Sequence, residues 1–411
     1  WNTRRARGVR PGTSRTQRRV AQVQLDGLRV VHLTSVHIPF DSRIFQKECR
    51  SLAEAGCRVT LVAPHDKEEV VDGVRVVPLQ KVSGRLGRVM RTARRAVDIA
   101  AALDADVYHL HDPELLLWAG RLKKTCRVVV FDMHEDLPLQ VRSKVWIPGI
   151  LRPAVSFLVK TMERRLIGAM PVVLAESSYK ANRKWLGDNV DVLNFPRLDW
   201  LSSLKTDQPP GARPRIGYIG AVTKERGSLV TLEALKILKD KGLEVDFECI
   251  GPTLPGHRAE LEGEVARLGL TGVELRGYLP PGEGWRRIAA CDIGVAVLEP
   301  IPNYRESYPT KMFEYMGMGL PVVVSDFPLY REIIEGAGCG YAVDPLDPTA
   351  VAKALGDLVA DRERAAALGK NGQAVALRKF NWETEKAKLV GFYARLAAAG
   401  PRNGRVTPAS G

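Results

Sequence analysis

The chain has 411 residues, 45% of them hydrophobic and 26% charged, so it is long enough for two globular domains and too apolar for a disordered protein. No apolar run approaches the ~18 residues that a membrane-spanning helix needs. The formal net charge is +14, of which residues 1–26, with seven arginines and one aspartate, carry +6. The remaining +8 lies on the body of the chain and favours a partner with negative charge.

Residues 1–26 are interpreted as a disordered basic arm, with neither a signal peptide nor a transit helix, because no apolar run follows the arginines. The six cysteines include no Cys-x-x-Cys pair and no spacing typical of a metal site or a secreted disulfide framework. We therefore expect a reduced, cytoplasmic setting.

The pattern from Leu28 onward alternates short β-branched runs with longer segments of helical period, which is typical of βαβ units in a parallel sheet. In the first half, the expected strands are residues 28–33, 59–62, 74–78, 107–110, 128–131 and 172–175. The expected helices between them include residues 42–55, 85–103 and 154–167.

A proline-rich stretch near residues 196–213 has the composition of an interdomain linker, and the alternation then begins again. The second set of expected strands is 215–219, 246–250, 273–276, 293–297, 321–324 and 341–343, with helices near 228–239, 258–268, 285–290, 310–316 and 349–368. The predicted fold class is α/β, with Rossmann-like domains at 27–195 and 214–378 facing a cleft. Ligands of such sheets lie beyond the carboxyl ends of the strands, so functional residues are expected in the loops there.

The densest polar motif is Glu306-Ser-Tyr-Pro-Thr-Lys-Met-Phe-Glu314. Pro309 suits a first helical position, because its missing N–H would have no partner there. The amides of Thr310 and Lys311 would then lie at the positive end of a helix dipole, which can bind a diphosphate. Glu314, one turn further on, is spaced to accept hydrogen bonds from two ribose hydroxyls. An ordinary helix N-terminus with solvated carboxylates remains the alternative on spacing alone.

A second basic candidate is the loop Gly220-Ala-Val-Thr-Lys-Glu-Arg-Gly227, which follows a predicted strand and precedes a predicted helix. The planar guanidinium of Arg226 could bind phosphate oxygens, and Gly220 lets a ligand approach the backbone closely. The alternative is a strand-to-helix turn with solvated charges.

Two polar clusters follow neighbouring strands of the first half: His109-Leu-His-Asp112, and Asp132-Met-His134-Glu135-Asp136. Both are expected to face the cleft, where His134 is suited to polar contact with a substrate. A structural histidine is the alternative. His109, His111 and Asp112 could also be metal ligands. However, the sequence shows neither an evident further ligand nor residues that would orient the histidines, so no metal is expected.

Basic residues also repeat at helical spacing in residues 85–95, and cations flank apolar residues in 144–152. Both stretches suit contact with an anionic lipid surface, to which each cation contributes about 1 kcal/mol. A solvated helix face is the alternative.

Together these motifs resemble the retaining glycosyltransferases of family 4, which have the GT-B fold, over residues 28–396. The most specific match is the Glu-x7-Glu motif from Glu306 to Glu314 with its continuation Tyr-Met-Gly-Met-Gly-Leu-Pro-Val-Val-Val-Ser. Further segments that match the family pattern are Asp132-x-His-Glu, Arg226-Gly, Asn194-x-Pro, Glu332-Ile-Ile and Phe380-Asn-Trp-Glu. The resemblance implies a C-terminal helix, placed at 379–397, that crosses back to the first domain, with a flexible tail at 398–411.

The resemblance also implies roles for individual residues. His134 and Glu306 would contact the donor sugar near the reacting centre. The other implied donor-site residues are Gly220, Lys224, Arg226, Gly277, Tyr278, Leu279, Thr310, Lys311 and Glu314. The leaving diphosphate would be stabilised by Arg226 and a helix N-terminus, without a metal and without a covalent enzyme intermediate.

Three departures from the family pattern concern the donor phosphates. Ala221 stands where many members have a cation, so Lys224 or Lys311 is expected to substitute. Pro309 stands where many members have glycine. The first loop lacks paired glycines, so its residues Asp41 and Arg43, with Asp112 and Glu135, are assigned to the acceptor side.

The sequence thus predicts a transferase that moves a sugar from a nucleotide diphosphate donor to a glycan or lipid-linked acceptor, in the cytoplasm or on the cytoplasmic membrane face. No cofactor beyond the donor substrate is expected. The alternatives are a nucleotide-sugar epimerase of the same fold and a basic nucleic-acid-binding protein. The second is disfavoured, because the arginine-rich arm contains only one aromatic residue, Trp1.

Overall fold

The computed structural model describes residues 25–82, 84, 87–124, 128–144, 147–204 and 213–399. The expected basic arm therefore lies outside the described residues except at its end. Leu25 is fully buried in the core of the first domain, so the expectation of a disordered arm is wrong at this residue. The expected C-terminal tail lies outside the described residues from residue 400 onward.

The N-terminal domain is built on an eight-stranded sheet with the strand order β3-β4-β2-β1-β5-β6-β7-β8. Its strands are β1 (Arg29–Leu33), β2 (Arg58–Pro64), β3 (Glu69–Val71), β4 (Val74–Leu79), β5 (Val107–Leu110), β6 (Val128–Met133), β7 (Val172–Leu174) and β8 (Asn189–Asp191). All neighbours are parallel except β3, which pairs with β4 in antiparallel fashion. The short strands β3 and β8 were missed by the sequence analysis, because three residues are too few for a periodic signal.

Short and long helices connect these strands. They are η1 (Ile44–Cys49), α2 (Arg50–Glu54), η2 (Arg88–Thr92), α4 (Ala93–Ala102), η3 (Pro113–Leu117), α5 (Gly120–Lys123), α6 (Leu137–Ser143), η4 (Gly149–Leu151), α7 (Arg152–Ile167) and η5 (Ser177–Lys180). The predicted helix at 42–55 begins with the π-helical segment η1, which Asp41 starts by accepting hydrogen bonds from the amides of Arg43 and Ile44.

The C-terminal domain has a fully parallel six-stranded sheet with the order β11-β10-β9-β12-β13-β14. Its strands are β9 (Arg215–Ile219), β10 (Asp246–Ile250), β11 (Val273–Gly277), β12 (Ile293–Ala296), β13 (Val322–Ser325) and β14 (Gly340–Val343). Every one was expected within one residue at each end. The central strands β12 and β13 are buried on both faces and therefore appear in the sequence as short apolar runs.

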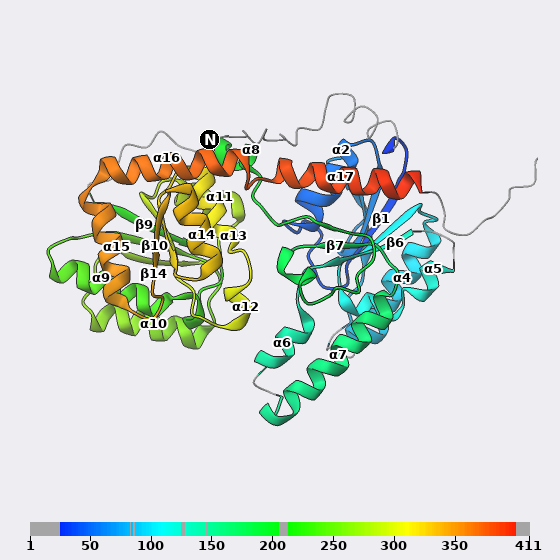
Figure 1. The fold of residues 1–411 in the computed structure, drawn as a ribbon, viewed down its shortest axis with the longest axis horizontal. Coiled ribbons are helices and arrows are strands. Elements are labelled where there is room, and N and C mark those ends of the chain that lie inside the picture. Colours follow the sequence, from blue (N-terminus) through cyan, green and yellow to red (C-terminus); the bar gives the residue numbers. More distant parts are fainter. Residues whose placement is uncertain are drawn as a thin grey trace, which may run out of the picture.

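Helices cover both faces of this second sheet (Figure 1). The helices of the second half of the chain are α8 (Leu198–Ser203), η6 (Lys224–Arg226), α9 (Ser228–Asp240), α10 (Pro255–Arg267), α11 (Pro281–Ala289), α12 (Pro302–Arg305), α13 (Thr310–Met318), α14 (Pro328–Ala337), α15 (Pro348–Ala360), α16 (Arg362–Arg378) and α17 (Trp382–Ala398), the last of which packs on the first domain. The single helix expected at 349–368 is two helices, because Asp361 leaves the helical conformation and caps α16 by accepting from the Arg364 amide. Pro309 lies just before α13 rather than in its first turn.

The last two helices join the domains. Figure 1 shows α16 along the second domain and α17 continuing across the first. Trp382, at the start of α17, donates from its indole nitrogen to the Ser51 hydroxyl at 2.8 Å, and the apolar side of α17 belongs to the core around β1 and β2. The expected crossover of the C-terminal helix is confirmed. Within the described part of the chain, no helix is both long and apolar enough to cross a bilayer.

Candidate active site

In both sheets the order of the strands reverses direction next to the first strand of the domain. In the first sheet β1 lies between β2 and β5, and in the second β9 lies between β10 and β12. At such a switch point the loops leave in opposite directions and open a crevice for a ligand. The loops that follow β1, β5, β9 and β12 therefore form the candidate site.

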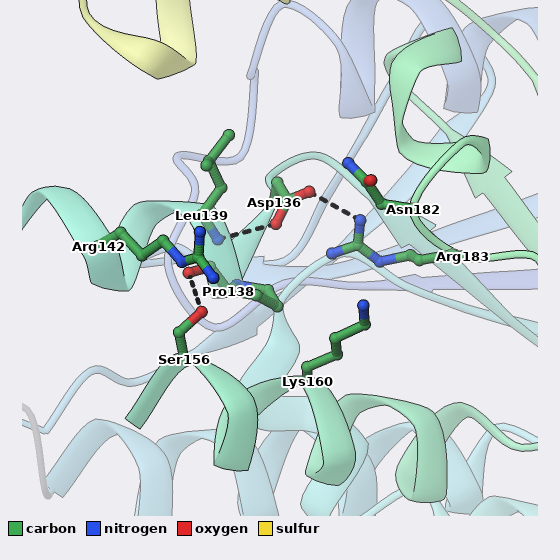
Figure 2. A pocket seen from close by; sticks show the side chains of 8 residues that line it. All are labelled: Asp136, Pro138, Leu139, Arg142, Ser156, Lys160, Asn182 and Arg183. Carbon is green, nitrogen blue, oxygen red and sulfur yellow. Dashed lines mark hydrogen bonds and ion pairs between the residues drawn. The ribbon is translucent and has the colours of Figure 1, made fainter. Parts of the chain in front are cut away.

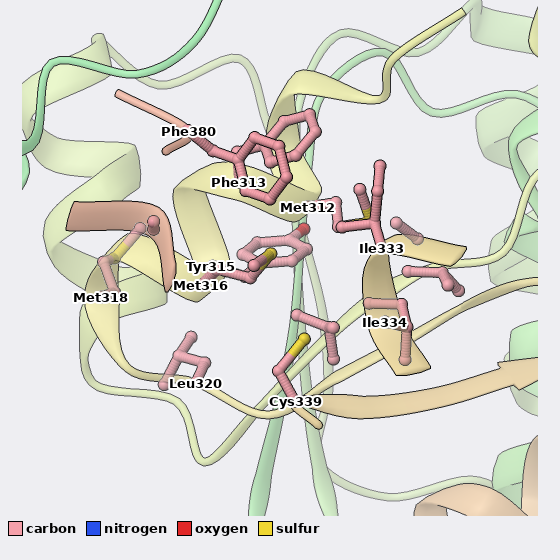
Figure 3. Close-up of a cluster of buried hydrophobic side chains, with 14 of the residues drawn as sticks. Met312, Phe313, Tyr315, Met316, Met318, Leu320, Ile333, Ile334, Cys339 and Phe380 are labelled. Atoms are coloured by element: carbon pink, nitrogen blue, oxygen red, sulfur yellow. The ribbon is translucent and has the colours of Figure 1, made fainter. Parts of the chain in front are cut away.

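Helix α13 is held in place by its apolar side. Met312, Phe313 and Tyr315 are fully buried in the cluster that Figure 3 shows. The Tyr315 hydroxyl accepts from the Ile219 amide at the end of β9, 3.1 Å away. A side chain at Gly294 would meet the Tyr315 ring at 2.4 Å, so this glycine lets α13 approach β12 closely. These contacts fix the start of α13 beside the loop after β9.

The ammonium of Lys311 occupies the space beside Gly220. A Cβ at Gly220 would lie 3.1 Å from Lys311 Nζ and 3.6 Å from Arg226 Nη1, so the two cations flank this glycine. Gly220 has a φ of 132°, which side-chain-bearing residues rarely adopt. Lys311 Nζ is buried, has no hydrogen-bond acceptor among the described residues, and lies 3.9 Å from the centre of the Tyr218 ring. Burial, together with the charge of Arg226, lowers the pKa of Lys311 to about 7.

Arg226 is held toward this space by Tyr304, whose hydroxyl accepts from its Nε at 3.3 Å. Thr310 lies at the open end of α13, where the first amides of a helix have no partner within it. The structure therefore brings Gly220, Arg226, Thr310 and Lys311 together, as the sequence analysis expected. Lys224, the other lysine considered for the position of Ala221, is exposed on the same loop, whereas Lys311 is buried.

Glu314 lies one turn after Lys311 and is half-buried. Its carboxylate interacts electrostatically with a lysine of the other domain. Burial raises the pKa of Glu314 to about 7, against the opposing charges of Lys47 and Lys311. Lys47 of η1 donates to the Asn194 side-chain oxygen at 2.6 Å, and burial lowers its pKa to about 8. Lys47 was not predicted as a site residue, because nothing in its local sequence pattern indicates an electrostatic interaction with a carboxylate of the other domain.

Glu176 is a second residue that sequence reasoning missed. It follows β7, and its carboxylate oxygens each lie 3.2 Å from the Tyr308 amide nitrogen, which donates from the Glu306–Glu314 segment of the other domain. Burial raises the pKa of Glu176 to about 8. The signal that could have found it is its position at the carboxyl end of a strand, next to the predicted cleft.

The remaining donor-side residues lie around the mouth of the site. Glu306 is exposed and lines a hollow of about 690 Å³, to which Ser178 of the first domain and Tyr308 of the second also contribute. Gly277 ends β11 with a positive φ of 71° and accepts from the Gly251 amide. Tyr278 is 69% exposed, and Leu279 packs against the apolar core.

A chain of polar side chains leads inward from His134. Its Nε2 lies 2.5 Å from Asp132 Oδ2, which is also 3.2 Å from His111 Nδ1, and His111 Nε2 is 2.8 Å from His32 Nδ1. Burial lowers the pKa of His32 and His111, which are therefore neutral near pH 7. His134 is the partly exposed end of this chain, as its expected contact with a substrate requires.

Two groups of side chains bring possible ligand atoms within 4.8 Å of one another among the described residues. One is His32, Glu48, His109 and His111, all buried, and the other is His111, Asp132 and His134. The set weighed from the sequence, His109 and His111 with Asp112, is neither of these. Instead Asp112 holds the loop after β1, because its carboxylate accepts from the Ser35 amide and the Thr34 hydroxyl.

The acceptor-side assignment of Arg43 is wrong. Arg43 is 5% exposed, and its guanidinium donates to both oxygens of Asp132 and to the Val192 carbonyl. Burial alone would raise the pKa of Asp132, but Arg43 holds it well below its usual range. Asp41 caps η1 and faces His37, and Glu135 is the exposed member of the acceptor-side set.

Two family models match the chain, one for each domain. Residues 42–183 match Glycosyltransferase Family 4, and residues 213–361 match Glycosyl transferases group 1. The phosphatidyl-myo-inositol mannosyltransferase of Mycobacterium leprae (strain TN) is 27% identical over 376 residues, 87% of this chain and 90% of that protein. The D-inositol 3-phosphate glycosyltransferase of Corynebacterium jeikeium (strain K411) is 30% identical over 198 residues, 46% of this chain and 45% of that protein.

Solved structures share the architecture over nearly the whole chain. Sucrose-phosphate synthase from Thermosynechococcus elongatus superposes with a TM-score of 0.71 at 19% identity and covers 91% of this chain and 100% of its own. An Anabaena protein in complex with UDP and glucose has a TM-score of 0.68 at 16% identity, covering 90% and 100%. These likenesses show the GT-B fold. The named relatives are transferases, which favours a transferase over the alternative of an epimerase. The chain is a glycosyltransferase that belongs to family 4.

Proposed function

We propose that the chain transfers a sugar from a nucleotide diphosphate sugar to a lipid-linked or glycan acceptor, with retention at the anomeric carbon and without a metal. The observation that carries this proposal is the pair of cations around Gly220, where Lys311 Nζ has no acceptor of its own among the described residues. A buried cation without a partner is costly unless an anion binds to it.

In this proposal Lys311, Arg226 and the first amides of α13 bind the diphosphate. As the sugar leaves, negative charge develops on the diphosphate, and preorganised donors stabilise it without reorganising. The two cations supply the charge that a divalent metal supplies in other transferases, so chelation of metals is expected to leave the rate unchanged. A rate that falls with EDTA and returns with a divalent cation contradicts this part of the proposal.

Glu314 is assigned to the ribose hydroxyls, and Gly277 to Leu279 to the base. His134 and Glu306 are assigned to the donor sugar, with Asp132 orienting His134 through the 2.5 Å contact. Retention is expected from the resemblance to the retaining glycosyltransferases of family 4: the acceptor oxygen would bond to the anomeric carbon on the same face from which the diphosphate departs, without a covalent enzyme intermediate. Proton NMR of the first-formed product reports the anomeric configuration.

A lipid-linked acceptor is favoured over a soluble glycan, because relatives that match over most of the chain are named as phosphatidyl-myo-inositol mannosyltransferases. The proposal accordingly includes contact with an anionic membrane surface on the cytoplasmic side. No nucleic-acid partner is part of it.

The test is nucleotide binding by variants of the two donor-site residues that lie on different elements. Glu314→Ala and Arg226→Ala are each expected to weaken binding of UDP or GDP, measured by thermal shift and by calorimetry. At a ligand concentration of 100 times the dissociation constant, binding raises the free energy of unfolding of the wild type by about 2.7 kcal/mol. Unchanged nucleotide binding in both variants overturns the proposal.

A further inference from the structure

The segment from α6 to α7 forms a hairpin that extends away from the first sheet (Figure 1). Its turn and its second helix carry large apolar side chains in contact with solvent. Ile150 is 89% exposed and Leu151 is 52% exposed at the turn, and on α7 the exposed fractions are 72% for Phe157 and 58% for Leu158.

The apolar residues of α7 lie on the face that turns away from the domain. Ser156, Glu163 and Ile167 are its buried residues, and their spacing of seven and four places them on one side. Leu158 and Met162 are one turn apart on the opposite side, and Met162 is 45% exposed. A solvated helix would have polar residues there, so this face fits an apolar environment.

The charges around this face have one sign. Residues 137–167 contain six cations and a single carboxylate, Glu163. That carboxylate is buried and paired with Arg183, so it does not reduce the positive charge at the surface. Exposed cations at Lys144, Arg164 and Arg165 flank the apolar residues.

Two further cations line a hollow of about 170 Å³ between α6 and α7. Figure 2 shows Arg142 and Lys160 at this hollow, where Arg183 is occupied by Asp136. Lys160 adds to the positive charge that lowers the pKa of Asp136, while Arg183 makes the hydrogen bond to that carboxylate. Phosphate groups bind well between such cations.

From these observations we infer that the α6–α7 hairpin docks on an anionic lipid bilayer. Ile150, Leu151, Phe157 and Leu158 enter the interface, and the surrounding cations contact lipid phosphates. A second copy of the chain is a poorer occupant, because two-fold pairing of this face would bring cations against cations. The inference rests on the proposed function only in that a lipid-linked acceptor would lie in the same bilayer.

This surface includes part of one stretch that the sequence indicated, because Lys144, Ile150 and Leu151 belong to residues 144–152, and it extends that stretch along α7. Ile147 is buried, while residues 85, 86, 145 and 146 lie outside the described part of the chain. Arg94 is engaged by Asp98 and lies over the Trp118 ring. The apolar residues of α7 were not among the predicted membrane contacts, because their alternation with Ser156 and Glu163 reads as an ordinary core helix.

The test is flotation of the full chain with vesicles of phosphatidylcholine alone or with about 30 mol% phosphatidylglycerol, whose negative surface attracts basic residues. The wild type is expected to float with the anionic vesicles only. The double variant Phe157→Ser/Leu158→Ser is expected to bind at least about tenfold more weakly, since two apolar side chains leave the interface. The matched control Leu377→Ser removes an apolar side chain that is 62% exposed on α16, and it should float as the wild type does.

Charge is tested separately with Arg164→Glu/Arg165→Glu, against Lys370→Glu on α16 as the control. Binding of UDP or GDP by the variants shows that they are folded and tests the donor site independently of docking. Equal flotation of wild type and Phe157→Ser/Leu158→Ser overturns the inference, as does failure of the wild type to float. A wild-type dimer in sedimentation that the double variant loses also overturns it, because the occupant would then be a second copy.

Discussion

Lys311 of α13 places its ammonium 3.9 Å from the centre of the Tyr218 ring of β9, with no hydrogen-bond acceptor among the described residues. The contact joins a helix N-terminus to the strand that precedes the Gly220 loop. The aromatic face compensates for part of the lost hydration of the cation. The remaining cost of dehydrating the Lys311 ammonium can be offset by an anion that binds beside Gly220.

Replacing Lys311 by methionine should therefore weaken nucleotide binding while the fold is retained. A hydrogen bond to a charged group contributes ~1.5–3 kcal/mol, so UDP or GDP affinity should fall about 10- to 150-fold in calorimetry. Lys224→Met changes an exposed lysine of the neighbouring loop and should fall less than about threefold. If Lys224→Met has the larger effect, the cation that replaces the one missing at Ala221 is Lys224 instead.

The pH dependence of nucleotide affinity should have two limbs that meet near pH 7. A diphosphate binds the protonated form of Lys311, whose pKa is about 7, so affinity falls as the pH rises above that value. Ribose hydroxyls donate to the ionised form of Glu314, whose pKa is also about 7, so affinity falls as the pH drops below it. Calorimetry from pH 5.5 to 9 measures both limbs.

The two variants of these residues separate the limbs. Lys311→Met should remove the alkaline limb and keep the acidic one, and Glu314→Gln should do the reverse. A wild-type affinity that is independent of pH across this range would show that neither group titrates on binding.

Gly220→Ala should also reduce nucleotide affinity, because the added methyl group meets Lys311 Nζ at 3.1 Å and the φ of 132° is strained for alanine. Strain of this kind costs about 1–3 kcal/mol, so we expect a lower melting temperature as well. The control is Gly256→Ala on α10, where a Cβ would meet nothing within 4 Å. Equal nucleotide binding by the two variants contradicts a ligand position against Gly220.

The strands and the start of α13 could be predicted because each depends on a local pattern. Strand β9 is a short apolar run before a glycine, and α13 begins after a proline. Lys47 could not be predicted as a site residue, because its electrostatic interaction with Glu314 crosses between the domains. For Glu176 the sequence offered only its position after a strand, because its partner, the Tyr308 amide, also lies in the other domain. Spacing along one chain carries no information on which residues meet across a cleft.

Arg43 illustrates the opposite error. In the sequence it follows an aspartate in a loop beyond a strand, the expected place for a ligand contact. In the structure its long side chain turns inward, because Asp132 lies at the end of β6 and needs a counter-charge in the core. The sequence shows the type of residue and its element, but not the direction of a flexible side chain.

Arg43→Met should accordingly act on stability rather than on the acceptor. Removing one partner of a buried ion pair costs about 3–5 kcal/mol, since Asp132 keeps a charge without its counter-ion. Chemical denaturation followed by hydrogen exchange of β1 measures this cost. Arg58→Met, at an exposed position at the start of β2, should change the stability by less than about 0.5 kcal/mol. A folded Arg43→Met with only a raised acceptor KM would restore the acceptor-side role.

The crossover helix should contribute to the stability of the first domain although it follows the second in sequence. Leu389 of α17 is fully buried in the core around β1 and β2, so Leu389→Ala should cost about 2–5 kcal/mol through the cavity it leaves. Leu377→Ala makes the same change at a 62% exposed site on α16 and should cost less than about 0.5 kcal/mol. Hydrogen exchange of β1 and β9 amides resolves the two domains, which need not unfold together. Protection should fall in β1 and persist in β9, because the buried side chains of α17 belong to the core of the first domain. An equal loss of protection in both strands would mean that the two domains unfold as one unit.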